Sequence, residues 1–162
     1  MTKKDYDPPY KQMFSNITFF KQLLKSFVSE KFVEEIDFES CEKIDKSFVS
    51  KRYENTESDL IYKVKLKNYE KEAYIYVLLE FQSSVDKFMV VRILNYITSL
   101  YLDMINASKK QDKKLLDKLP PVFPIMLYNG DRNWTSKVSI SELIENNALL
   151  GDYGINFKYF KI

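Results

Sequence analysis

Histidine is absent from this 162-residue sequence, and cysteine and glycine are scarce. Without histidine there is no imidazole metal ligand, no imidazole general base and no histidine-activated nucleophile. The single cysteine, Cys41, excludes a disulfide within the chain and a cysteine zinc cluster. Three glycines are too few for a glycine-rich phosphate-binding loop. Catalysis would therefore depend on carboxylate, amide, lysine, arginine or tyrosine groups, with a hard metal ion as the expected helper.

A long hydrophobic run is also missing. The most apolar stretch, 88–107, is interrupted by Arg92, Asn95 and Asp103, which is typical of a helix buried within a protein rather than a membrane span. The amino terminus has charged residues but no apolar stretch after them, unlike a signal peptide. We therefore expect a soluble, cytoplasmic protein without membrane contact.

What the sequence does contain is enough apolar material for one packed domain. Hydrophobic residues make up 45% and aromatic residues 15% of the chain, and neither a repeat nor a Gly/Ser linker divides it. We expect a single domain over 1–162. The net charge of +2 does not by itself indicate nucleic-acid binding. Segment 30–45 holds seven acids and two lysines, so the rest of the chain is mildly basic, which suits either an anion-binding face or an ordinary solvated surface.

The hydrophobic spacing predicts the order helix, three strands, helix, strand. Apolar residues recur every three or four positions from Pro9 to about Ser29, which indicates an amphipathic helix. The acidic segment after it is expected to be a loop or a short helix. The remaining elements are expected to be strands at 41–52, 59–67 and 73–82, a helix at 88–107, a lysine-rich loop at 109–118, a strand at 122–129, a short helix near 140–147 and a strand-like segment at 155–162.

The strands at 59–67 and 73–82 are expected to form an antiparallel hairpin about a turn at 68–71, centred near 69.5. Alternation places Leu60, Tyr62, Val64 and Leu66 on one face of the first strand and Asp59, Ile61, Lys63 and Lys65 on the other. The strand at 73–82 is apolar almost throughout, so it should be central and should pair parallel with the strand after the long helix. The predicted fold class is therefore α/β with a mixed central sheet.

Two acids stand out by their surroundings. Asp59 opens a strand, and Glu80 interrupts an apolar one, two residues before Gln82. Both acids lie 10.5 positions from the turn centre, so the hairpin should bring them to one sheet edge. In one interpretation Glu80 pairs with Lys63 or Arg92 and Asp59 caps a turn. In the other, two carboxylates, a main-chain carbonyl and waters bind Mg²⁺, which activates water and offsets charge on phosphorus.

Four blocks of this sequence resemble the Rpn family of recombination-promoting nucleases, which belong to the PD-(D/E)XK superfamily and are also described as putative transposases. The blocks are DPPYKQMF (7–14), SDLIYKVKL (58–66), AYIYVLLEFQSS (73–84) and LPPVFPIMLYNG (119–130), with Trp134 after the last. Their order and spacing cover nearly the whole chain. The resemblance implies a restriction-endonuclease-like core of helix, three strands, helix, strand. It also implies a metal-dependent DNA endonuclease associated with recombination or mobile elements.

The resemblance further implies a role for each site residue. Asp59 and Glu80 are similar to the two acids that bind Mg²⁺, and the carbonyl of Phe81 would be a further ligand. Gln82 stands where the wider superfamily usually has lysine, although glutamine is usual in this family. Its amide can orient the attacking water but cannot act as a base at neutral pH. Lys63 either supplies the missing cation or is a plain surface lysine.

Two departures from the family pattern qualify these roles. Tyr6-Asp7 stands where relatives commonly have His-Asp, and the chain ends at Ile162 within a strand-like segment, whereas relatives usually continue. We therefore leave open whether the domain is truncated at its carboxyl terminus or is a short gene product. The alternative function is a catalytically inactive nuclease-fold domain that binds nucleic acid or another partner. DNA is the expected partner, and a homodimer is left open.

Other residues have two interpretations each. Trp134 and Tyr128 either stack on bases or pack in the core, and the lysines of 109–114 either touch phosphates or are solvated. Arg92 holds Glu80 or a phosphate, or else forms a structural ion pair. For these residues the structural alternative is the one we expect, and Cys41 is expected to be an inert packed thiol.

Overall fold

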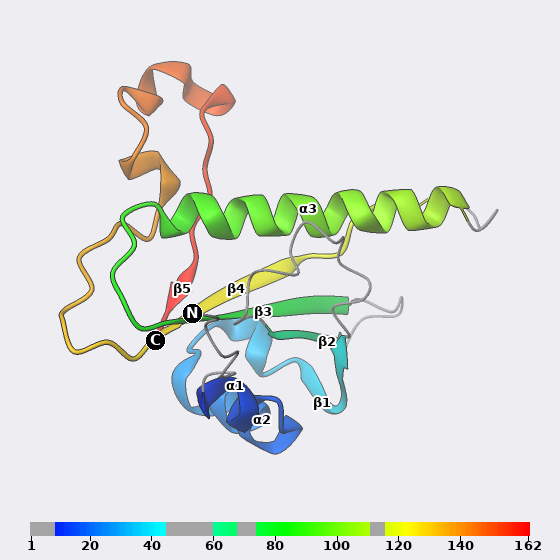
Figure 1. The fold of residues 1–162 in the computed structure, drawn as a ribbon. Coiled ribbons are helices and arrows are strands. Elements are labelled where there is room, and N and C mark those ends of the chain that lie inside the picture. Colours follow the sequence, from blue (N-terminus) through cyan, green and yellow to red (C-terminus); the bar gives the residue numbers. More distant parts are fainter. Residues whose placement is uncertain (1–8, 45–59, 68–73, 111–115) are drawn as a thin grey trace, which may run out of the picture.

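The computed structural model describes residues 9–44, 60–67, 74–110 and 116–162, with the backbone alone for Tyr10, 74–81 and Lys110 (Figure 1). A five-stranded sheet in the order β1-β2-β3-β4-β5 forms its centre. Two short helices cover one face of this sheet, and one long helix lies across the other (Figure 1). The elements are α1 (Pro9–Phe14), α2 (Ile17–Phe27), β1 (Ile36–Ile44), β2 (Leu60–Leu66), β3 (Tyr74–Gln82), α3 (Met89–Lys110), β4 (Val122–Tyr128) and β5 (Phe160–Lys161), with 3₁₀ turns at Lys31–Val33, Ile140–Glu142 and Asn147–Tyr153.

The sheet is mixed, as predicted. β1, β2 and β3 pair antiparallel in sequence order, whereas β4 pairs parallel with β3 and β5 pairs parallel with β4. The parallel pair needs a crossover connection, and α3 provides it. The strand predicted to be central, β3, is the third of the five. The α/β class and the order of the first six main elements are therefore confirmed.

The β2–β3 hairpin has the predicted register. Leu60 pairs with Leu79 at one end and Lys65 pairs with Tyr74 at the other, so every pair is centred on position 69.5. Residues 68–73, which include the predicted turn, lie outside the described residues. Since strands alternate their side chains, this register decides which residues of β2 meet each layer of helices.

Two apolar clusters occupy the two faces of the sheet. Tyr62 of β2 lies in the first cluster, where its ring stacks on Phe20 of α2 with centroids 3.8 Å apart. The Tyr62 hydroxyl donates a 2.6 Å hydrogen bond to the carbonyl of Phe14 and so ties α1 to the sheet. Ile61, the next residue, packs in the second cluster with Met89 of α3. The predicted alternation of β2 is therefore confirmed by the packing.

The amino-terminal helix is divided, which corrects the prediction of one helix over 9–29. α1 ends at Phe14 and α2 begins at Ile17. Asn16 between them has an extended backbone, and its side chain accepts a hydrogen bond of 2.9 Å from the Thr18 N–H. Asparagine caps helices well because it satisfies a free N–H group in this way. The apolar spacing runs through this break, so the periodicity alone gave no sign of it.

The first strand begins at Ile36, within the acidic segment that was expected to be a loop or short helix. The prediction of a strand from Cys41 is therefore too late at its start, and its last residues, 45–52, lie outside the described part. Two acids of β1 lie opposite lysines in the ladder, since Asp37 is in register with Lys65 and Glu42 with Lys63. Opposite charges on paired strands stabilise a sheet, and an acidic edge strand resists further pairing.

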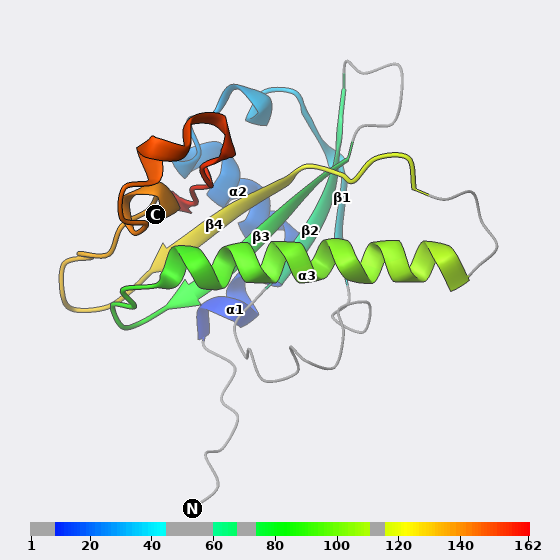
Figure 2. The same cartoon turned by 90° about the horizontal axis from the view of Figure 1, so that it is seen from above.

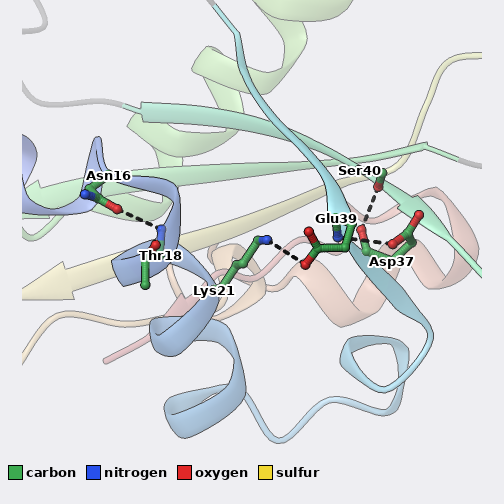
Figure 3. A network of polar contacts seen from close by, with 6 residues as sticks. All are labelled: Asn16, Thr18, Lys21, Asp37, Glu39 and Ser40. Carbon is green, nitrogen blue, oxygen red and sulfur yellow. Dashed lines mark hydrogen bonds and ion pairs between the residues drawn. The ribbon is translucent and has the colours of Figure 1, made fainter.

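An irregularity in β1 between Asp37 and Glu42 is supported by side chains (Figure 3). The Ser40 hydroxyl donates to the Asp37 carbonyl at 2.6 Å and accepts from the Lys65 N–H at 2.9 Å, in place of a backbone ladder bond. Lys21 of α2 reaches Glu39 at 3.2 Å and links the helix to this strand. The bulge is thus satisfied by local hydrogen bonds rather than left open.

Three later elements also differ from the sequence-based boundaries. α3 continues to Lys110, so the first two residues of the predicted lysine-rich loop are helical, and 111–115 lie outside the described residues. The helix expected near 140–147 is replaced by two 3₁₀ segments. The strand expected over 155–162 is regular only at Phe160–Lys161. None of the helices in the described ranges is both long and apolar enough to cross a membrane.

Candidate functional site at the carboxyl ends of β3 and β4

The candidate site lies where β3 and β4 end and α3 begins (Figure 2). Gln82, the last residue of β3, is in register with Tyr128, the last residue of β4. The ladder continues one step further, because the N–H of Asn129 donates to the carbonyl of Gln82 at 3.1 Å. β2 runs antiparallel to β3, so its first residue, Leu60, belongs to the same end of the sheet. Crevices outside the carboxyl ends of strands are frequent ligand sites in α/β proteins.

The structure describes three of the four predicted site residues. Glu80 and Phe81 belong to the backbone of β3, where they pair with Met126 and Leu127 of β4. Gln82 is half-buried, and its amide nitrogen lies 3.4 Å from the Ser84 hydroxyl. The predicted partner acid, Asp59, lies outside the described residues. The assignment of these residues to catalysis and to metal binding stays a prediction.

Within the described residues, cysteine and acidic side chains form no group of three that could hold a metal ion. The Asp59 and Glu80 carboxylates are not among the side chains described. The observation therefore concerns only the described side chains and leaves the predicted pair untested.

Gly130 allows the chain after β4 to pass close to the end of β3. A Cβ atom at Gly130 would run into the carbonyl of Ser83 and the ring and hydroxyl of Tyr128. The glycine is therefore required by space, since only a residue without a side chain permits this approach. The chain after β4 therefore passes close to Ser83, the residue that follows Gln82.

An ion pair stands between the end of β3 and the start of α3. Asp86 accepts a hydrogen bond from the Arg92 guanidinium at 2.8 Å and another from the Phe88 N–H at 2.8 Å. Burial alone would raise the pKa of the Asp86 carboxyl, but these hydrogen bonds and the positive charge of Arg92 outweigh it and hold the pKa below its usual value. The ion-pair interpretation of Arg92 is thereby confirmed. Asp86 was missed by sequence reasoning, although an aspartate just before a helix is a recognised capping signal.

Aromatic residues from the last part of the chain pack beside this edge. The Tyr128 and Trp134 rings meet edge to face with centroids 4.9 Å apart, and the Trp134 indole donates to the Tyr159 hydroxyl at 3.1 Å. Burial raises the pKa of Tyr159, the indole hydrogen bond opposes this, and the negative charge of Asp86 adds to it. Both Tyr128 and Trp134 are half-buried and pack against the core cluster next to α3, in agreement with the structural interpretation. No local pattern pointed to Tyr159.

Two further residues have defined surroundings. Lys63 is half-buried on β2, in register with Glu42 on one side and Tyr76 on the other. Its assignment to the site stays a prediction. Cys41 is buried in the cluster under α2, and burial, as the largest of several influences, raises the pKa of its thiol to about 11. A thiol that stays protonated is a poor nucleophile, so Cys41 is the inert packed thiol that was expected.

Comparison with known proteins now places the chain. The family described as "Putative transposase, YhgA-like" matches residues 4–159, nearly the full length. The chain belongs to this family, and the resemblance to Rpn proteins found in the sequence is confirmed.

Two curated relatives come from Escherichia coli. The chain is 31% identical over 97 residues to the "Recombination-promoting nuclease RpnD" of strain O157:H7, a match that covers 60% of this chain and 34% of the relative. It is 24% identical over 135 residues to the "Inactive recombination-promoting nuclease-like protein RpnE" of strain K12, which covers 81% of this chain and 42% of the relative. The matches thus span less than half the length of either protein. No solved structure matches it.

Proposed function

We propose that this chain is a metal-dependent DNA endonuclease with a restriction-endonuclease-like core, which hydrolyses phosphodiester bonds in connection with DNA recombination. The mixed sheet, its strand order and the α3 crossover agree with that core. A relative carries the name of a recombination-promoting nuclease. Fold and family only raise the expectation, so the argument depends on the site residues.

The observation that carries the proposal is the register of the β2–β3 hairpin. All six pairs from Leu60–Leu79 to Lys65–Tyr74 keep the same register. If the same register extended by one residue, Asp59 would pair with Glu80. Alternation would then assign Asp59 to the face of Ile61, which packs on the α3 side, and would assign Glu80 and Gln82 to one common face. Residues paired directly across an antiparallel ladder have Cβ atoms about 5 Å apart, near enough to share an ion.

The donor set fits Mg²⁺. Asp59 and Glu80 would supply carboxylate oxygens and Phe81 a main-chain carbonyl oxygen, which are the hard ligands this ion prefers. When bound, the ion would lower the pKa of water and offset negative charge on the phosphate. Gln82 would hold the attacking water through its amide, because an amide donates and accepts hydrogen bonds but does not take up a proton at neutral pH.

The test is cleavage of supercoiled plasmid by the purified chain, with Mg²⁺ and with EDTA. Asp59→Asn and Glu80→Gln remove one charge each and keep the side-chain size, and both should reduce cleavage to the level seen with EDTA. Asp131→Asn and Glu34→Gln are the matched controls, since both residues are exposed. Cleavage that survives in the two site variants would come from elsewhere and would refute the site.

Metal binding should be measured separately from cleavage. If the site holds Mg²⁺, the ion should raise the Tm of the wild-type chain and of the control variants but not that of Asp59→Asn, because a ligand that binds only the folded state stabilises it. Gln82→Lys should keep activity, since lysine is the superfamily's usual residue there. Gln82→Leu should lose about 100-fold through a misplaced water.

A second candidate function is a nuclease-fold domain that binds DNA without cleaving it. The name of the second relative, which describes an inactive nuclease-like protein, favours this alternative. It predicts that the chain retains DNA in EDTA and yields no cleavage product with Mg²⁺. If wild type and Asp59→Asn retain DNA equally and neither cleaves it, the result would support this second function.

A further inference from the structure

The face of α3 that points away from the sheet carries a regular row of residues, which we call the seam. Its positions alternate in steps of three and four, the spacing of a helix that packs along another helix. Phe88, Val91 and Leu102 on this row are exposed. The opposite side of the helix is the buried side, with Met89 and Ile93 in the core. The seam consists of Phe88, which directly precedes α3, and of Val91, Asn95, Thr98, Leu102 and Ile105 within the helix.

The seam is apolar at its two ends and polar in the middle. In an antiparallel pair of such helices, each end of one helix meets the opposite end of the other. Val91 would then pack on Leu102 of a second copy and Phe88 on its Ile105, while the polar Asn95 would meet Thr98 at the centre. Each polar side chain thus faces a polar one, a pattern that selects one register over its neighbours.

A projecting segment, residues 139–157, stands beside the amino-terminal half of α3 and extends further from the sheet than the helix does (Figures 1 and 2). We call it the arm. Its base is held by a bridge between Ser139 and Lys158 and by a 2.9 Å hydrogen bond from the Ile140 N–H to the Phe157 carbonyl. Its tip exposes large apolar side chains, among them Leu149 at 83% and Tyr153 at 92% of their surface. So much exposed apolar surface on a fixed segment indicates a contact with a partner.

The arm and the far end of α3 carry opposite charges. The arm has three acids and no lysine or arginine. The segment 109–118, which starts at the carboxyl-terminal end of α3, has five lysines and two aspartates. The arm stands beside the amino-terminal end of α3 (Figure 1), whereas Lys109 and Lys110 are the last two residues of the helix. An antiparallel partner helix would bring its own basic end to the arm, which is the charge complementarity that orients an interface.

We propose that a second copy of this chain covers the seam, so that two α3 helices pack antiparallel about a two-fold axis near Asn95 and Thr98. Each arm then flanks the carboxyl-terminal half of the partner's helix, with Leu149 and Tyr153 against it and the acids of the arm near Lys109 of the second copy. Such an interface is isologous, so each favourable contact occurs twice.

The seam is tested by sedimentation velocity over a range of protein concentrations, without DNA or metal. Val91→Glu and Leu102→Glu should each weaken dimerisation on the order of 100-fold, because a charge enters an apolar contact twice per dimer. Phe19→Glu is the matched control, since Phe19 lies on α2 beyond the sheet and is 43% exposed, as Val91 is. It should dimerise as wild type does. A wild-type chain that stays monomeric at the highest concentrations would refute the proposal, whatever else covers the seam.

The antiparallel arrangement is tested by charge reversal and mixing. An arm variant, Glu145→Lys with Asp152→Lys, makes both ends of the contact basic, and a helix variant, Lys109→Glu with Lys110→Glu, makes both acidic. Each variant alone should dimerise on the order of tenfold more weakly than wild type. An equal mixture should form heterodimers, because each basic group then meets an acidic one in both contacts. A mixture that dimerises no more tightly than either variant alone would show that the arm does not contact the end of the partner's helix.

Discussion

The hydrogen bond from Tyr62 to Phe14 should contribute measurably to stability. Tyr62 is fully buried between α2 and the sheet, and its hydroxyl donates to the Phe14 carbonyl at 2.6 Å. Burial, more than the nearby Cys41, raises the pKa of this phenol to about 12, so the hydroxyl keeps its proton at neutral pH. Tyr62→Phe removes this one oxygen and leaves the ring in place on Phe20.

The expected cost follows from what the substitution removes. The aromatic stack at 3.8 Å and the apolar contacts of the ring remain, so no large cavity forms. What is lost is one buried hydrogen bond, which is worth about 1 kcal/mol net, and somewhat more if the carbonyl finds no other donor. For a chain of this length, that free energy corresponds to a decrease in Tm of about 2–4 °C.

The assay is urea unfolding followed by far-ultraviolet circular dichroism, with Tyr153→Phe as the control. Tyr153 is 92% exposed, so removal of its hydroxyl should change the free energy of unfolding by less than about 0.5 kcal/mol. Tyr62→Phe should lower the midpoint with the same slope, because the surface exposed on unfolding hardly changes. Equal midpoints for the two variants would show that the hydroxyl contributes nothing and would refute the reasoning.

Two other predictions concern packing and pH. Gly130→Ala should destabilise the chain by about 1–3 kcal/mol, since the new Cβ meets the Ser83 carbonyl and the Tyr128 ring. The measurement is a thermal melt beside wild type, and an unchanged Tm would show that this position does not require glycine. Cys41 should make the wild type less stable as pH rises between 9.0 and about 11, because the folded state holds the thiol proton more tightly than the unfolded state does. Cys41→Ala should show a shallower decline across that window in urea titrations, and an unchanged decline would contradict the buried pKa.

The elements that were predicted well are those whose pattern is local. The alternation in 59–67 and the apolar run in 73–82 were enough to predict β2, β3 and their register, since a strand repeats every two residues. The long helix was predicted from an apolar stretch that Arg92, Asn95 and Asp103 interrupt. The boundary at Asn16 was missed because the apolar spacing continues through it, whereas one hydrogen bond from the Thr18 N–H to the Asn16 side chain caps the start of a separate helix there.

The errors in the rest of the chain arise from contacts between distant segments. β1 was partly assigned to a loop because its acids look like a solvated run, and only the lysines of β2 across the ladder show why they suit a strand. The arm was predicted to contain a regular helix and instead has two 3₁₀ segments, with Asn146 and Gly151 at positive φ between its turns. At the candidate site, the sequence indicated Glu80 and Gln82, but not Asp86 or Tyr159.

By itself, the sequence determined the chemistry open to this protein, its α/β class and its family, because these depend on residue types and on short-range spacing. The lack of histidine and the isolated acids at 59 and 80 needed no coordinates. Only the tertiary structure decided that Arg92 forms an ion pair with Asp86 and that Trp134 and Tyr159 pack beside the ends of β3 and β4. It also decided that the seam and the arm face outward. Those outcomes depend on which side chains from distant segments come into contact when the layers pack, and a local sequence pattern does not predict such contacts.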